Sequence, residues 1–231
     1  MGRFGANGNR RASAAARNTS MSTISIIGAG GMAAAISGLA AKAGHTVEVT
    51  SRDAAKALAL ARQVGSGATT GTFGAAPAGD IVILAVPYAA VLDVVKQYGK
   101  ELAGKLLVDI TNPVAPDYVS FVTPADSFGA HEIARAAPAD AQVVKAFNTL
   151  FSHVLAAGPV EGHPLDVFIA GDDAQAKARV SAFIGSLGLR PMDTGLLPMA
   201  RTLEHVCLLS LGLMTHSIKH TNFAIGVSLL G

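Results

Sequence analysis

The chain has 231 residues, half of them hydrophobic and 5% aromatic, so it has ample aliphatic material for a buried core. Its formal net charge of +2 gives no reason to expect a nucleic-acid or membrane surface as a partner. The single cysteine, Cys207, excludes an internal disulfide and a multi-cysteine metal site. Its apolar neighbours predict a buried, unreactive thiol, in keeping with a cytoplasmic location.

Residues 1–20 differ in composition from the rest of the chain. They hold four arginines and no acidic residue, among many Gly, Ser, Ala and Asn residues. This composition is typical of a disordered extension or of sequence upstream of a start at Met21, and a transit peptide is the alternative. We therefore expect the fold to occupy residues 21–231.

A short apolar strand, Thr23–Ile27, is predicted to run into a glycine turn that opens an Ala-rich helix, Met32–Ala43. Strand, glycine turn and helix in this order are the layout of a dinucleotide-binding unit. Gly28 allows the sharp turn, Gly30 lets the backbone approach a pyrophosphate, and Ala33 lets the helix lie close to the strand. The free N–H groups at the helix start would face the phosphates. A small-residue turn without a ligand is the alternative for this pattern on its own.

The junction after the second predicted strand, His45–Thr50, indicates which dinucleotide is bound. In NAD sites a carboxylate near this position binds the ribose hydroxyls. Here the hydroxyl of Ser51 and the guanidinium of Arg52 stand in its place, and both suit a 2′-phosphate. Asp53 is the counter-argument, but it is better placed to cap the next helix, Ala54–Val64. The sequence therefore favours NADP over NAD.

Beyond residue 64, predicted strands alternate with helices, which indicates parallel pairing and right-handed crossovers. The strands are expected at 69–72, 80–86, 105–110, 142–146, 165–170 and 189–193, and the helices at 89–98, 128–137 and 174–187. The apolar stretch 199–230 is broken by charges and is too short to span a membrane, so a buried or subunit-interface helix is expected there. The prediction is an α/β fold: one Rossmann-type domain with a doubly wound parallel sheet and a small C-terminal helical annex from about residue 199.

Three predicted strands end in residues suited to a nicotinamide pocket, because open α/β sheets bind ligands at the carboxyl ends of their strands. These residues are Ala85, Val86, Pro87 and Tyr88, then Asn112, and then Ala146, Phe147 and Asn148. Packing or turn formation is the alternative for each of them taken alone.

No pattern predicts a catalytic acid, base or nucleophile, and we assign no catalytic residue. His216 and His220 have no placed carboxylate or cysteine beside them, so no metal site is expected. Hydride transfer between two redox rings needs no acid–base pair, since face-to-face placement does most of the work. A small carbonyl or imine substrate would need a proton donor, for which Tyr88 and Lys145 are the candidates. A non-catalytic, NADP-binding redox sensor is the third alternative.

Several motifs resemble those of the NADP oxidoreductases that depend on coenzyme F-420, a deazaflavin. They are Ile26–Met32, Ser51-Arg52, Ala85-Val86-Pro87, Asp109–Pro113, Val143–Thr149, Ala170–Asp173 and Arg201–Glu204. The resemblance implies a Rossmann domain that is usually a homodimer. It also implies that NADP(H) lies along Gly28–Met32, with its 2′-phosphate near Ser51 and Arg52 and its nicotinamide by Val86 and Pro87.

The form of residues 145–149 is also similar to a broad branch of this family and to the cytosolic domains of metalloreductases. Members of that branch need not use the deazaflavin, so FMN, FAD or quinone-like acceptors stay open as the small-molecule partner. The predicted cofactor-binding residues are Gly28, Ala29, Gly30, Gly31, Met32, Ala33, Ser51, Arg52, Ala85, Val86, Pro87, Tyr88, Asn112, Ala146, Phe147 and Asn148.

Overall fold

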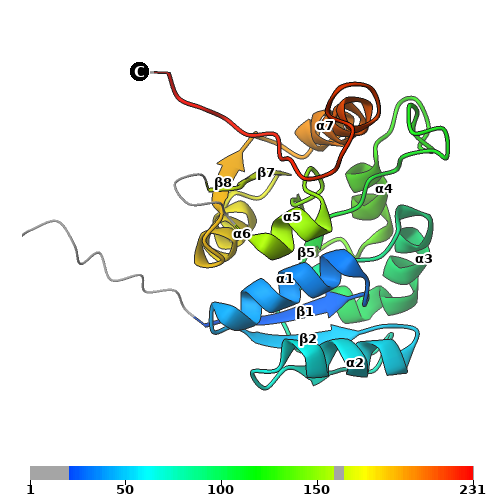
Figure 1. Ribbon diagram of the computed structural model, residues 1–231. Helices are drawn as coiled ribbons and strands as arrows, with labels where there is room; N and C mark the ends of the chain where they lie inside the picture. Colours follow the sequence, from blue (N-terminus) through cyan, green and yellow to red (C-terminus); the bar gives the residue numbers. More distant parts are fainter. Residues whose placement is uncertain (1–20, 159–163, 231) are drawn as a thin grey trace, which may run out of the picture.

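The computed structural model describes residues 21–158 and 164–230, so the extension expected over residues 1–20 lies outside the described residues. An eight-stranded sheet, in the order β3-β2-β1-β4-β5-β6-β7-β8, is covered by helices on both faces (Figure 1). The strands are β1 (Thr23–Ile27), β2 (Thr46–Thr50), β3 (Thr69–Thr70), β4 (Ile81–Leu84), β5 (Leu106–Asp109), β6 (Gln142–Lys145), β7 (Asp166–Gly171) and β8 (Arg190–Asp193). The helices are α1 (Gly31–Lys42), α2 (Ala54–Val64), α3 (Tyr88–Tyr98), α4 (Gly129–Ala136), α5 (Ser152–Ala157), α6 (Ala174–Ser186) and α7 (Met199–Leu213), with helical turns η1 (Gly99–Leu102) and η2 (Met214–Ile218).

The chain changes direction across the sheet at β1. It runs outward from β1 to β2 and β3, and then crosses to β4 on the other side of β1. At the carboxyl end of β1, Ile27 pairs with Thr50 of β2 and with Leu84 of β4. Open α/β sheets bind their ligands outside the carboxyl ends of the strands at such a switch point. The topology therefore predicts a ligand site at the loops that follow β1, β2 and β4.

Two hydrophobic cores lie on opposite faces of the sheet. One packs the sheet against α1, α2, α5 and α6, and the other packs it against α3, α4 and α7. Along β4, Ile81 and Ile83 enter the first core, whereas Val82 and Leu84 enter the second. Successive strand residues point to opposite faces, so a strand covered on both sides needs an unbroken apolar run. The doubly wound α/β sheet expected from the sequence is confirmed.

One expectation about the sheet is wrong. β7 runs antiparallel to β6, with Lys145 paired to Ala170 and Val144 paired to Gly171, so pairing is not parallel throughout. The helix between these strands, α5, has only six residues and is about 9 Å long. The chain enters β7 from the same edge of the sheet at which it left β6. Helix α6 then restores a parallel crossover to β8.

The C-terminal stretch is helical only in its first part. Helix α7 continues as the π-turn η2, which ends at Lys219 in the left-handed region at φ +65°. The chain then runs back over α5 and β8 (Figure 1), where Thr221 contacts His153 and Val227 hydrogen-bonds to Asp166 and Arg190. No helix in residues 21–158 or 164–230 is long and apolar enough to cross a membrane.

The tightest constraint in the sheet lies at Gly28. This residue has φ +129°, and its N–H donates to Thr50 O at 2.8 Å. A Cβ at this position would lie 2.0 Å from Ala85 O, a backbone atom that cannot rotate away. The loops after β1 and β4 therefore meet only because position 28 has no side chain.

Gly28→Ala is expected to destabilise the fold by about 3 kcal/mol or more, because it adds both backbone strain and a backbone clash. Urea denaturation followed by circular dichroism would measure the loss. Gly38→Ala is the matched control, since a Cβ there meets no atom within 4 Å and Gly38 lies inside α1. That change should raise stability by about 0.5–1 kcal/mol. Equal urea unfolding midpoints for the two variants would contradict the steric role of Gly28 beside Ala85.

Candidate functional site

The start of α1 presents backbone N–H groups that no side chain caps. Gly30 is the N-cap residue, it offers no side-chain hydrogen bond, and the first turn contains no acidic residue. A Cβ on Gly30 would meet no atom within 4 Å, so the space beside this backbone is open. Ala33, the third small residue of the motif, is fully buried against the sheet. This arrangement fits a pyrophosphate, because the uncapped N–H groups and the positive end of the helix dipole favour an anion.

A cavity of about 590 Å³ lies beside this turn, within the size range of small-molecule sites. The glycine turn forms one side of it through Gly30–Met32. The end of β4 contributes Ala85, Val86, Pro87 and Tyr88, and the end of β5 contributes Ile110, Thr111 and Asn112. Its third wall comes from the irregular segment after β5, through Val114, Pro116 and Val122. The structure thus brings the predicted residues of the first two strand ends around one mainly apolar cavity.

The residues predicted from the third strand end lie behind this wall rather than on it. Ala146 and Phe147 are fully buried, and Asn148 is nearly so. Phe147 adopts φ +60°, a left-handed conformation that is rare for a bulky residue and reverses the chain here. Asn148 Nδ2 then donates to Asn112 Oδ1 at 2.9 Å, and Asn112 Nδ2 donates to Asn148 O at 2.8 Å. Asn148 therefore orients the Asn112 side chain from within the protein.

Ser51 and Arg52 follow β2 at the same edge of the sheet as the glycine turn. Arg52 is exposed and makes no hydrogen bond or ion pair with the described residues. Asp53 accepts hydrogen bonds from Ala55 N at 3.0 Å and Lys56 N at 3.2 Å, so its predicted role as the cap of α2 is confirmed. With Asp53 held by the helix, the Arg52 guanidinium is available to an external anion.

A buried ion cluster lies behind the cavity, and sequence reasoning missed it. Lys145 Nζ donates to Asp109 Oδ2 at 2.8 Å, to Glu204 Oε1 at 2.8 Å and to Thr111 O at 2.6 Å. All three charged side chains are essentially inaccessible to solvent. A lysine inside the apolar run of residues 143–147 was the available signal, because a buried lysine needs a charged partner.

Lys145 is consequently unsuited to protonate a substrate. Burial acts to lower its pKa, but the charges of Asp109 and Glu204 outweigh burial and hold that pKa above its usual value. All three of its N–H donors are used inside the protein. Glu204 in turn accepts backbone hydrogen bonds from Gly129 and Ala130 at the start of α4.

Tyr88 in the cavity wall and the partly buried Cys207 in α7 both stay in their neutral forms. Burial, together with the charges of Glu132, Glu204 and Asp109, raises the pKa of Tyr88 to about 12. Burial likewise raises the pKa of Cys207 to about 11, as expected of an unreactive thiol. In the described part of the chain, no group of three His, Cys, Asp or Glu residues could hold a metal ion.

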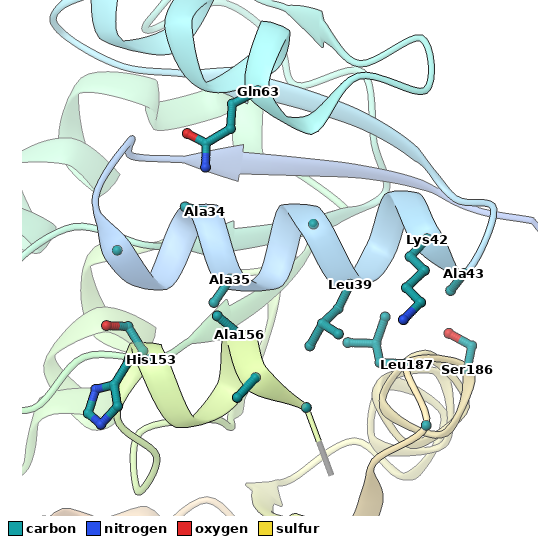
Figure 2. A pocket seen from close by; sticks show the side chains of 16 residues that line it. Ala34, Ala35, Leu39, Lys42, Ala43, Gln63, His153, Ala156, Ser186 and Leu187 are labelled. Carbon is teal, nitrogen blue, oxygen red and sulfur yellow. The ribbon is translucent and has the colours of Figure 1, made fainter. Parts of the chain in front are cut away.

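A second and larger cavity, of about 750 Å³, lies along the outer side of α1 next to α5 and the end of α6 (Figure 2). Its walls are mostly small side chains such as Ala34, Ala35 and Ala156, and Leu39 and Leu187 face each other across it. Among its described lining residues, the side chains of Lys42 and His153 can carry charge, and three others are polar. The smaller cavity lies at the carboxyl edge of the sheet beside the switch point, where open α/β sheets bind their ligands, so it is the better functional candidate.

Comparison with known proteins identifies the family of the chain. The family model described as NADP oxidoreductase, coenzyme F-420-dependent, matches residues 23–113. An F-420-dependent NADP reductase of Methanocaldococcus jannaschii is 33% identical over 162 residues, which cover 66% of this chain and 69% of that protein. The chain belongs to this family. The residues of this chain that match the family model run from β1 to Pro113, so Lys145 and Glu204 lie beyond the match.

Two further proteins are similar over different lengths. The crystal structure of a protein from an Arthrobacter species, named as a candidate F-420-dependent NADP reductase, is 26% identical with a TM-score of 0.78. That similarity covers 89% of this chain and 99% of the other. Metalloreductase STEAP3 of Rattus norvegicus is 38% identical over 108 residues, which are 47% of this chain and 21% of that protein. The chain thus matches about a fifth of the metalloreductase, and most of that protein has no counterpart in the match.

Proposed function

We propose that this protein transfers a hydride between NADP(H) and a ring-type acceptor, either a deazaflavin such as coenzyme F-420 or a flavin such as FMN or FAD. The observation that carries the proposal is the cavity at the switch point of the sheet, which joins the glycine turn to the apolar ends of β4 and β5. The similarity to F-420-dependent NADP reductases supports both the dinucleotide and the class of acceptor.

In this proposal the cofactor extends across the carboxyl edge of the sheet. The N–H groups of Gly30–Met32 bind the pyrophosphate, and Ser51 and Arg52 bind the 2′-phosphate. The nicotinamide rests against Val86 and Pro87, beside Asn112, and when bound it supplies or receives the hydride. The chain's own contribution is to hold the ring, orient it and exclude water from a mainly apolar cavity.

A ring acceptor is favoured over a small carbonyl or imine by the absence of a suitable acid among the described cavity residues. Tyr88 is the one phenol in the cavity wall, and a pKa of about 12 makes it a weak proton donor at neutral pH. Its hydroxyl has no hydrogen-bond partner among the described residues that could assist proton release. Lys145, the other candidate, is enclosed by its own partners.

The NADP assignment predicts that Arg52→Ala weakens NADPH binding by about tenfold and leaves NADH binding unchanged, because only NADPH offers a phosphate to the guanidinium. Fluorescence titration of each nucleotide would measure both constants. Arg62→Ala is the matched control, since Arg62 is an exposed cation in the last turn of α2, the helix that follows Arg52. Equal affinities of the unaltered protein for NADPH and NADH would sink the assignment, as would an unchanged preference in Arg52→Ala.

The acceptor class predicts the behaviour of Tyr88→Phe. Oxidation of NADPH by a deazaflavin, FMN or FAD should change by no more than about threefold, because hydride transfer between rings needs no proton from Tyr88. Stopped-flow spectroscopy across these acceptors, a small ketone and a cyclic imine would test this. Turnover of the ketone or imine, reduced by about a hundredfold or more in Tyr88→Phe, would instead identify a carbonyl or imine reductase. Tight NADPH binding without oxidation by any acceptor would identify a redox-sensing module.

We also propose that the protein is a homodimer whose two copies meet through α7. The outer side of this helix carries Leu209, which is 55% exposed, and the partly exposed Val206, Leu208 and Leu213. A surface helix with apolar residues around most of its circumference is typical of a subunit interface.

Leu209→Lys should convert such a dimer to a monomer, because it places a charge in an apolar interface. Sedimentation equilibrium would show the change. Leu58→Lys is the control, since Leu58 is an exposed leucine on α2, away from the proposed interface. A monomeric unaltered protein would contradict the proposal.

A further inference from the structure

The ion cluster around Lys145 joins three parts of the fold that are distant in sequence. Asp109 ends β5, Lys145 ends β6, and Glu204 lies in α7. The lysine is separated from these two carboxylates by 36 and 59 residues along the chain. Each charge is fully satisfied, since Glu204 also accepts from the start of α4 and Asp109 Oδ1 accepts from Thr111 N and Oγ1.

Stability alone is a weak reason for this arrangement. Removing a lysine and two carboxylates from water is expensive, and well-packed apolar residues in their place are often as stable or more so. Here the cluster does something that apolar residues cannot do. It fixes a backbone carbonyl at a defined point, because Lys145 Nζ donates to Thr111 O at 2.6 Å.

Thr111 is held from two sides as a result. Asp109 binds its N–H at 2.8 Å and its hydroxyl at 2.7 Å, while Lys145 binds its carbonyl. Asn112 comes next in the chain and lines the cavity at the strand ends. Its side chain is fixed by Asn148, whose Nδ2 also donates to Leu203 O, the residue beside Glu204 in α7. Backbone and side chain of the cavity wall are thus both tied to the same buried region.

We propose that Lys145 is a positioning residue that holds the Thr111-Asn112 wall against the nicotinamide end of the cofactor. The proposal rests on the proposed function, which puts the nicotinamide in the cavity beside Asn112. It assigns Lys145 no contact with the cofactor and no part in proton transfer. The adenosine half of the cofactor lies at the glycine turn and Ser51-Arg52, where the cluster makes no contact, so loss of Lys145 should leave that half unaffected.

A fragment of the cofactor separates positioning from general stability. Dissociation constants of NADPH and of 2′,5′-ADP, which lacks the nicotinamide, would be measured for the unaltered protein and for Lys145→Met. NADPH should bind about tenfold more weakly to the variant, whereas 2′,5′-ADP binding should be unchanged. Hydride transfer at saturating NADPH should fall by about a hundredfold, as expected when a reacting ring is misplaced.

Two further variants guard the experiment against loss of the fold. Asp109→Asn keeps the side-chain shape and removes one of the two charges that hold Lys145. It should therefore weaken NADPH binding by less than about tenfold and leave 2′,5′-ADP binding unchanged. Arg190→Met is the control, because Arg190 forms another ion pair, with the buried Asp166, and neither residue lines the cavity. It should lower the unfolding midpoint without changing the ratio of the two dissociation constants.

The outcomes are distinct. If NADPH and 2′,5′-ADP both bind more weakly, by the same factor, to Lys145→Met and to Asp109→Asn, the cluster has a structural role and the proposal is overturned. Unchanged binding of both ligands to both variants would overturn it as well. If the unaltered protein binds the fragment as tightly as NADPH, the nicotinamide placement itself fails. That result concerns the proposed function and is visible before any variant is made.

Discussion

The close approach of Gly28 to Ala85 is the contact on which the rest of the site depends. At the switch point of a doubly wound sheet, the loops after β1 and β4 leave adjacent strands in the same direction and compete for one space. A hydrogen atom in place of a side chain at position 28 lets them share it. The first helix then starts close to the sheet edge, with its uncapped N–H groups beside the cavity. One missing methyl group therefore decides where an anion can bind.

Charge in this protein is divided between groups that are satisfied and groups that are left available. The Lys145 cluster is closed, with each donor and acceptor engaged by the protein itself. The glycine turn and Arg52 are open, since neither is paired with a side chain in the described residues. Closed charges give rigidity, and open ones give affinity for a ligand that brings the opposite charge. In the proposed cofactor placement, the open groups face the adenosine half and the closed cluster lies behind the nicotinamide pocket.

Much of the fold could be predicted because its signals are local. The apolar run of β4, the small residues around Gly28 and the capping side chain of Asp53 each act within a few positions of their effect. The same holds for the cavity residues from Ala85 to Tyr88 and for Asn112, since a strand end puts its next residues at the sheet edge. The antiparallel β7 had no such signal, because the direction of a strand depends on the path of the chain before it and not on the residues of the strand itself.

The part of the site that escaped prediction depends on contacts between distant segments. Periodicity assigns residues 142–146 to a buried strand, but it cannot say which carboxylates reach Lys145 from 36 and 59 positions away. The same limit applied to Asn148, which lies in a turn that the left-handed Phe147 directs inward. Both residues act on the cavity through Thr111 and Asn112 and not by lining it. Residues that line the cavity were therefore easier to recognise from sequence than the residues that hold them in place.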